Sequence, residues 1–75
     1  MKAKIGEYYL HKKGGLYKVT GFAKHTETEE TLVIYSAIKE PEVNWARPKE
    51  MFEDGTYVLL EDLYKNDFFK VDNIF

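Results

Sequence analysis

The sequence has no cysteine, only two prolines and no long hydrophobic run. Without cysteine the chain can form neither a disulfide bond nor a thiolate zinc site, which fits a reducing, cytoplasmic location. The stretch MKAKIGEYYL is positively charged but lacks the apolar segment of about 7–15 residues that marks a signal peptide. The longest apolar run, TLVIYSAI, is much shorter than the roughly 20 residues that cross a bilayer, so we expect no membrane partner.

An excess of charge of one sign is also missing. The 11 Lys and Arg residues against 13 Asp and Glu residues give a formal net charge of −2 at pH 7. Nucleic-acid-binding domains usually carry a basic surface, so we do not expect nucleic acid as a partner. The 75 residues suffice for a single domain, which we expect to span residues 1–75. Aromatic residues make up 16% of the chain, and their large buried areas offset its small size.

Short runs of β-branched and aromatic residues alternate with turn signals and predict a series of strands. The predicted strands span residues 7–11, 16–25, 31–38 and 43–47. Gly14 and Gly15 can adopt the positive φ that a tight turn between the first two strands requires. Gly21 lies inside the second strand and predicts a bulge or a bend there.

The C-terminal third of the chain is less regular. Pro48 can begin a helix over KEMFE, and Asp54-Gly55 can end it. Residues 56–75 fit either a helix or a hairpin made of TYVLLE and FFKVD around KND. We favour the hairpin, because about five short strands can close into a barrel without exposed edges. The predicted fold is therefore mainly β, a small SH3-like β-barrel of about five strands with one short helix after Pro48.

A polar cluster lies between two apolar runs and is larger than a plain turn requires. In the stretch GFAKHTETEETLVIY, the residues HTETEE would form a hairpin loop at one rim of the barrel. Arg47 ends a predicted strand just before a helix N-terminus, where a guanidinium and free backbone N–H groups can hold an anion. The predicted ligand-binding residues are His25, Thr26, Glu27, Thr28, Tyr35, Trp45 and Arg47, with His11 as an additional candidate.

Each of these residues also has a purely structural interpretation. His25 can cap the turn, and the neighbouring threonines can satisfy backbone groups there. Glu27 can pair with Arg47 or with a lysine at the surface, and Trp45 can belong to the core. The polar cluster would then be an internal hydrogen-bond network that holds the barrel in shape.

Patterns for catalysis, metals and cofactors are weak. The two histidines lack the i, i+4 spacing of a helical zinc site, and Ser36 lies in mid-strand without a serine–histidine–acid pattern. No glycine pattern matches a phosphate-binding loop. We therefore expect neither metal nor cofactor, and the sequence favours binding over an enzymatic reaction.

Four motifs occur in an order that is typical of one protein family. They are HKKGGLYKV (11–19), AKHTETEE (23–30), VIY (33–35) and WARPKEMF (45–52). On these motifs the chain resembles the domain of unknown function family numbered 1653, whose members are short bacterial and phage proteins. The resemblance covers about residues 6–53 and implies a small β-rich domain of no assigned activity. It points to the same polar residues, His25, Glu27, Thr28 and Arg47; Thr26 replaces the usual serine, and the usual Pro-Arg-Phe ending is missing.

Two functions of different classes fit these features. The first is a module that binds a small anionic ligand, nucleotide-like or phosphorylated, with Arg47 on the anion and an aromatic ring stacked on the ligand. The second is a protein-interaction module, in which an aromatic groove receives a peptide or a second copy of the chain as a homo-oligomer. That groove would be lined by Tyr8, Tyr9, Tyr17 and Trp45.

Overall fold

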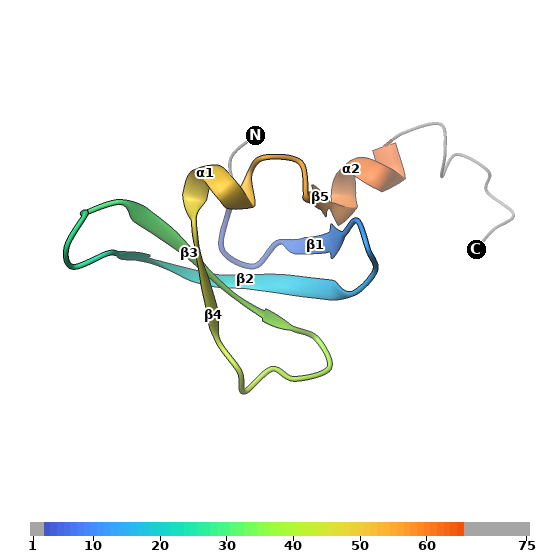
Figure 1. Ribbon diagram of the computed structural model, residues 1–75. Coiled ribbons are helices and arrows are strands. Elements are labelled where there is room, and N and C mark those ends of the chain that lie inside the picture. The colour runs from blue at the N-terminus through green and yellow to red at the C-terminus, as the bar shows by residue number, and fades with distance from the viewer. Residues whose placement is uncertain (1–2, 66–75) are drawn as a thin grey trace, which may run out of the picture.

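The computed structural model describes residues 3–65, which form one antiparallel sheet and two short helices (Figure 1). The elements are β1 (Tyr8–His11), β2 (Leu16–Lys24), β3 (Thr31–Ala37), β4 (Trp45–Pro48), α1 (Lys49–Phe52), β5 (Tyr57–Leu59) and α2 (Leu60–Lys65). The strands are ordered β4-β3-β2-β1-β5 in the sheet. The predictions of a mainly β chain and of a short helix after Pro48 are confirmed.

The turn between β1 and β2 forms at the predicted glycines. Gly14 and Gly15 have φ of 102° and 99°, a region that residues with a side chain rarely adopt. The His11 carbonyl accepts a hydrogen bond from the Gly14 N–H, and the His11 N–H donates to the Gly15 carbonyl. This closure aligns Leu10 with Leu16 and sets the register of the two strands.

The bulge predicted at Gly21 is present in the long hairpin of β2 and β3. Val19 pairs with Tyr35, but the next pair joins Gly21 to Ile34, so Thr20 is the extra residue of β2. The Thr20 hydroxyl donates to the Ile34 carbonyl at 3.3 Å. Beyond the bulge, the side chains of β2 continue in the opposite alternation.

One face of the sheet carries the core. Its buried apolar residues are Ala3, Tyr9, Val19, Val33, Tyr35, Phe52 and Tyr57. Phe52 comes from α1, and its ring packs against Tyr9 at 5.0 Å and against Tyr57 at 4.6 Å between ring centroids. Each fully buried side chain of this kind contributes roughly 1.5–3 kcal/mol. Helix α1 therefore covers the core over the centre of the sheet (Figure 1).

The predicted closure into a barrel is wrong. No strand pairing joins β4 to β5 within residues 3–65, so the sheet is open and both strands are edges. The two end strands are only four and three residues long, which leaves too little backbone for a closing ladder. Pro48 also lacks the N–H group that a ladder on β4 would use.

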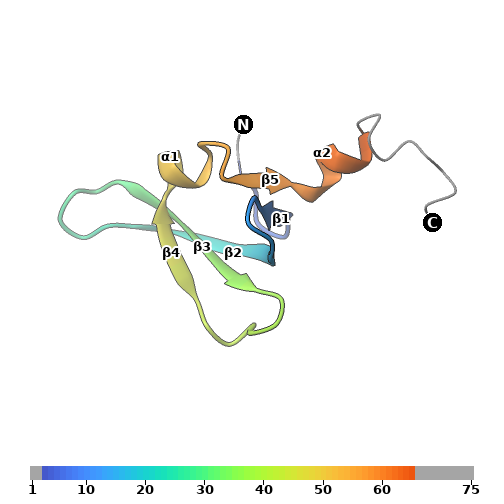
Figure 2. The same cartoon turned by 45° about the vertical axis from the view of Figure 1, so that its right-hand side comes forward.

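The first strand of the preferred C-terminal hairpin, TYVLLE, is confirmed only over β5, and its last two residues are helical. After β5 the chain turns into α2, which begins at Leu60 and extends away from the sheet (Figure 2). In this segment the chain follows the helical spacing of its apolar residues rather than the alternation of a strand. The second predicted strand, FFKVD, lies outside the described residues. Neither helix between residues 3 and 65 has the length and apolar character to cross a bilayer.

Candidate functional site

The polar loop between β2 and β3 is held by its own side chains. The Nδ1 atom of His25 accepts hydrogen bonds from the backbone N–H groups of Glu27 at 3.1 Å and Thr28 at 3.3 Å. With Nδ1 as an acceptor, a neutral imidazole carries its proton on Nε2. The interpretation of His25 as a capping residue is therefore confirmed.

The second half of the loop is bonded in the same local way. The Thr28 hydroxyl accepts from the Glu30 N–H and donates to the Glu30 carboxylate, both at 3.2 Å. Glu29 has a φ of 62°, the left-handed conformation that completes the turn. Thr26 and Glu27 are exposed, and Glu27 forms no ion pair with Arg47. The polar cluster HTETEE thus forms a hairpin loop whose side-chain hydrogen bonds are made within the loop.

Arg47, Trp45 and Tyr35 meet on the core face of the sheet, away from that loop. Strand pairing sets Trp45 opposite Tyr35 and Arg47 opposite Val33, so all four side chains share one face. Tyr35, the partner of Trp45, lies four residues along β3 from the loop end at Thr31, roughly 13 Å at strand spacing. In Figures 1 and 2 the β2–β3 loop extends beyond the rest of the sheet. The structure therefore divides the predicted site residues into two groups.

Three tyrosines surround the point where this face is hollow. Tyr17, Tyr35 and Tyr57 contact one another edge to face, with ring centroids 5.5–5.6 Å apart. The hydroxyl groups of Tyr35 and Tyr57 form a buried hydrogen bond at 3.1 Å. Burial, followed by this bond, raises the pKa of Tyr57 above its ordinary value. The Tyr57 phenol therefore stays protonated at neutral pH.

The guanidinium of Arg47 lies on this aromatic cluster. It is 5.5 Å from the centre of the Tyr57 ring, within the range of a cation–π contact. A hydrogen bond with Tyr35 raises the pKa of Arg47 against the opposing effect of burial. Arg47 is half-buried and forms no ion pair with any carboxylate of residues 3–65. A positive charge thus lies on an aromatic surface with no carboxylate at ion-pair distance, although the more distant Asp54 acts on it electrostatically.

His11 joins the same cluster from β1. Its ring packs edge-on against Tyr57 at 4.9 Å and, at a tilt, against Tyr17 at 6.4 Å. The Nδ1 atom accepts a hydrogen bond from the Lys13 N–H at 3.0 Å. The neutral ring therefore presents an Nε2–H donor. The additional candidate His11 lies with Tyr35, while His25 does not.

A cavity of about 280 Å³ opens in this face, and we call it the aromatic hollow. Its lining residues are Tyr17, Tyr35, Ala37, Glu40, Trp45 and Tyr57. Trp45 is 52% exposed, so its assignment to the core is wrong. None of the ring contacts found within residues 3–65 involves the indole. The indole is therefore available to a ligand.

The comparisons with known proteins agree with the resemblance seen in the motifs. Residues 7–62 match the family model described as a protein of unknown function (DUF1653). The chain belongs to the DUF1653 family. The match extends past the last sequence motif and includes β5 and the start of α2. No curated protein and no solved structure matches the chain.

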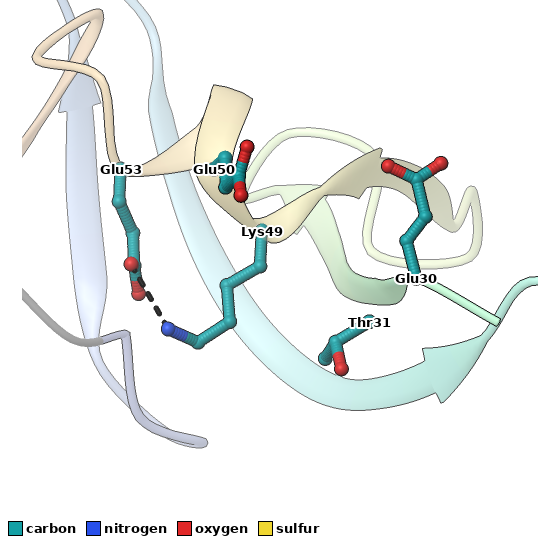
Figure 3. Close-up of a pocket in the computed structure, with 5 residues that line it drawn as sticks. All are labelled: Glu30, Thr31, Lys49, Glu50 and Glu53. Atoms are coloured by element: carbon teal, nitrogen blue, oxygen red, sulfur yellow. Dashed lines mark hydrogen bonds and ion pairs between the residues drawn. The ribbon is translucent and has the colours of Figure 1, made fainter. Parts of the chain in front are cut away.

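The DUF1653 domain has another hollow between α1 and the start of β3 (Figure 3), which we call the acidic hollow. It is lined by Glu30, Thr31, Lys49, Glu50 and Glu53. Its one cation is already engaged, since the Lys49 ammonium bonds Glu53 Oε1 at 3.0 Å. The other oxygen of Glu53 accepts from the Ala3 N–H at 2.7 Å and ties the N-terminal segment to α1. This hollow has a structural role and repels the anion that the sequence predicts.

The aromatic groove predicted for a protein partner is not formed as a unit. Tyr8 pairs with Lys18 and Tyr9 pairs with Tyr17, so the two neighbouring tyrosines lie on opposite faces of the DUF1653 sheet. Tyr9 is buried in the core, where its hydroxyl donates to Glu7 at 2.9 Å. Only Tyr17 and Trp45 of the four predicted groove residues line a common hollow.

Three residues of the aromatic hollow were missed by the sequence interpretation: Ala37, Glu40 and Tyr57. Tyr57 lies in the stretch whose secondary structure was ambiguous. Its pairing with His11 places its side chain on the core face of the sheet. Glu40 lies in the loop after β3, for which the sequence offers no periodicity. A signal for Tyr57 exists in the alternation of TYVL, in which Tyr57 and Leu59 share a face. Between residues 3 and 65, no group of three His, Asp or Glu side chains is placed to hold a metal ion.

Proposed function

We propose that this domain binds a small anionic ligand at the aromatic hollow, where Arg47, which lies on the Tyr57 ring beside the hollow, engages the anion. The observation that carries the proposal is the half-buried guanidinium on the Tyr57 ring, with no carboxylate of residues 3–65 at ion-pair distance. A guanidinium offers five N–H donors in one plane, and the ring uses none of them strongly. The remaining N–H groups can donate hydrogen bonds to an anion.

The hydroxyl groups of Tyr35 and Tyr57 also favour a ligand that accepts hydrogen bonds. Arginine can only donate, so the Tyr35 oxygen accepts from Arg47. In the bond between the Tyr35 and Tyr57 hydroxyls either group can be the donor, and in both cases one O–H of the pair is left to donate into the hollow. Successive hydrogen bonds of this kind polarise one another. The cluster therefore ends in a donor, which complements a ligand rich in acceptors.

The aromatic walls favour a ligand with an apolar or planar part. The indole of Trp45 is exposed at the edge of the hollow, and the ring of Tyr17 is half-buried beside it. Aromatic side chains around a few polar groups are the usual composition of small-molecule sites. The polar loop with His25, by contrast, uses its donors and acceptors internally and is left out of the proposed site.

A fluorescence titration tests the proposal directly, because Trp45 is the only tryptophan of the chain. We expect small carboxylates, phosphorylated metabolites or nucleotides to change the Trp45 emission and to raise the melting temperature of the wild type. At a hundredfold the dissociation constant, a ligand stabilises by about 2.7 kcal/mol. Arg47→Gln should lose at least tenfold in affinity, and Lys24→Gln, the same charge change on the distant hairpin, should not. Equal binding by both variants would contradict the assignment of Arg47 as the anion-binding residue.

A protein-interaction module is the second candidate, and the open edge of β4 favours it. An unpaired edge strand can accept a strand from a partner or from a second copy of the chain. This function predicts concentration-dependent association in sedimentation experiments that Arg47→Gln leaves unchanged. It also predicts that Ala46→Pro, which removes a further N–H group from the edge strand, weakens association without affecting small anions.

A further inference from the structure

A second, more apolar cavity adjoins the aromatic hollow, and we call it the apolar hollow. It measures about 600 Å³ and is lined by Gly15, Leu16, Tyr17, Ala37, Ile38, Lys39 and Glu40. Tyr17, Ala37 and Glu40 line both hollows, so the two are continuous around the Tyr17 ring. Ile38 is 44% exposed at this position, which leaves an apolar side chain in contact with water. A ligand with an apolar body can cover it.

The charges around the two hollows sum to a small positive value. The charged residues that line them are Lys39 and Glu40, whose charges cancel. Lys12 and the exposed Asp54 lie outside both linings, and their opposite charges act on each other. Arg47, on the Tyr57 ring beside the aromatic hollow, therefore leaves one net positive charge.

That balance distinguishes between classes of anion. A single carboxylate neutralises the site and can form two parallel hydrogen bonds with one guanidinium. A phosphate monoester brings about 1.5 to 2 negative charges at neutral pH. Its second charge would face Glu40, the one charged residue that lines the aromatic hollow, and would find no second cation beside Arg47. The electrostatic environment therefore matches a monoanion.

We propose that the ligand is an amphipathic monocarboxylate, with its carboxylate on Arg47 and its aromatic or aliphatic body extending past Tyr17 into the apolar hollow. This inference rests on the proposed anion site and names the chemistry of its ligand. The body would contact Leu16 and Ile38, and the Trp45 ring would cover its carboxylate end. The carboxylate would accept from the guanidinium and from whichever hydroxyl of the Tyr35–Tyr57 pair does not donate to the other.

Three probes with the same ring separate the possibilities. Phenylacetate carries one negative charge, phenyl phosphate carries close to two at pH 8, and 2-phenylethanol carries none. We expect phenylacetate to change Trp45 emission with at least a threefold lower dissociation constant than phenyl phosphate and a tenfold lower one than the alcohol. Titrations with the full chain at constant ionic strength measure all three. Ile38→Ser should weaken phenylacetate severalfold but leave acetate, which has no apolar body, unchanged.

The outcomes separate the two proposals. Tighter binding of phenyl phosphate, abolished by Arg47→Gln, would overturn the monocarboxylate and retain the anion site. Equal binding of the alcohol and the acid, or no binding of any probe, would overturn both proposals. If Arg47→Gln does not fold, the NMR signals of the wild type decide. Phenylacetate must then shift the Trp45 indole N–H and the Ile38 methyl signals together, and shifts confined to other faces would overturn the assignment.

Discussion

Arg47 and Lys49 show how two cations two residues apart acquire different roles. Lys49 reaches along α1 to the carboxylate of Glu53, a local i, i+4 pair. Arg47 precedes the helix on a strand, and its pairing with Val33 turns it onto the aromatic face. A planar guanidinium stacks on rings more readily than a strongly hydrated ammonium does. Exchange of arginine for lysine would therefore preserve the charge of the site but lose its geometry.

His25 offers a test of the loop at the level of one side chain. We expect His25→Ala to lower the free energy of unfolding by about 1 kcal/mol, because the N–H groups of Glu27 and Thr28 lose their acceptor. In a domain of this size such a loss lowers the melting temperature by roughly 4–8 °C. Thermal unfolding followed by circular dichroism measures the change.

His25→Asn is the matched control, because the short amide oxygen can accept the same turn hydrogen bonds. It should retain most of the wild-type stability. Both variants should bind anions as the wild type does, since the loop lies away from Arg47. Loss of anion binding in His25→Ala, with stability unchanged, would contradict this division of the polar residues.

At the scale of elements, the β1–β2 turn positions the Tyr17 wall of both hollows. Gly14 and Gly15 have nearly equal positive φ, but a Cβ atom on Gly15 would lie 3.2 Å from the Tyr17 ring, while one on Gly14 meets nothing. We expect Gly14→Ala to cost about 1–2 kcal/mol from backbone strain alone. Gly15→Ala should cost more, and it alone should alter probe binding through Tyr17. Paired denaturant titrations and fluorescence titrations measure both effects.

Elements that depend on local signals could be predicted from the sequence. The glycine pair fixed the first turn, Gly21 marked the bulge, and Pro48 marked the start of α1. Each signal acts within a few residues, because it concerns the φ angle or the N–H group of one position. The hairpin loop at His25 was recognised for the same reason.

Features that depend on distant contacts could not be predicted. The facing of Trp45 follows from its pairing with Tyr35, ten positions earlier in the chain. Barrel closure depended on whether the last segment continued as a strand, and there the helical spacing after Leu59 decided. The contact between the Arg47 guanidinium and the Tyr57 ring depends on the strand order, in which β1 lies between β2 and β5. The members of the candidate site were therefore mostly predicted, but their grouping was not.

For the molecule as a whole, buried phenols should make the folded state less stable at alkaline pH. Burial is the largest cause that raises the pKa of Tyr9 above 10.0, and the same holds for Tyr57. A pKa raised in the folded state contributes stability that is complete below the unfolded value and declines as pH rises above it. We therefore expect the denaturant midpoint to fall above about pH 10. Urea titrations at several pH values measure the decline.

Two adjacent substitutions isolate this effect. Tyr9→Phe removes one buried phenol and should make the decline shallower, although the lost bond to Glu7 lowers stability at neutral pH. Tyr8→Phe changes an exposed ring on the other face and should keep the wild-type profile. Identical profiles for Tyr9→Phe and the wild type would show that the buried tyrosine does not control alkaline unfolding.

The extra residue in β2 divides the long hairpin into two halves of opposite parity. Between the β1–β2 turn and the bulge, odd-numbered residues such as Tyr17 and Val19 share the face of Tyr35; beyond it, Phe22 shares the face of Val33. Deletion of Thr20 would place Gly21 directly after Val19, so the pairs of Gly21 with Ile34 and of Phe22 with Val33 would continue the ladder without a bulge. Phe22 would stay on the face of Val33. The extra residue therefore bends and twists the outer hairpin without changing which of its side chains face the core.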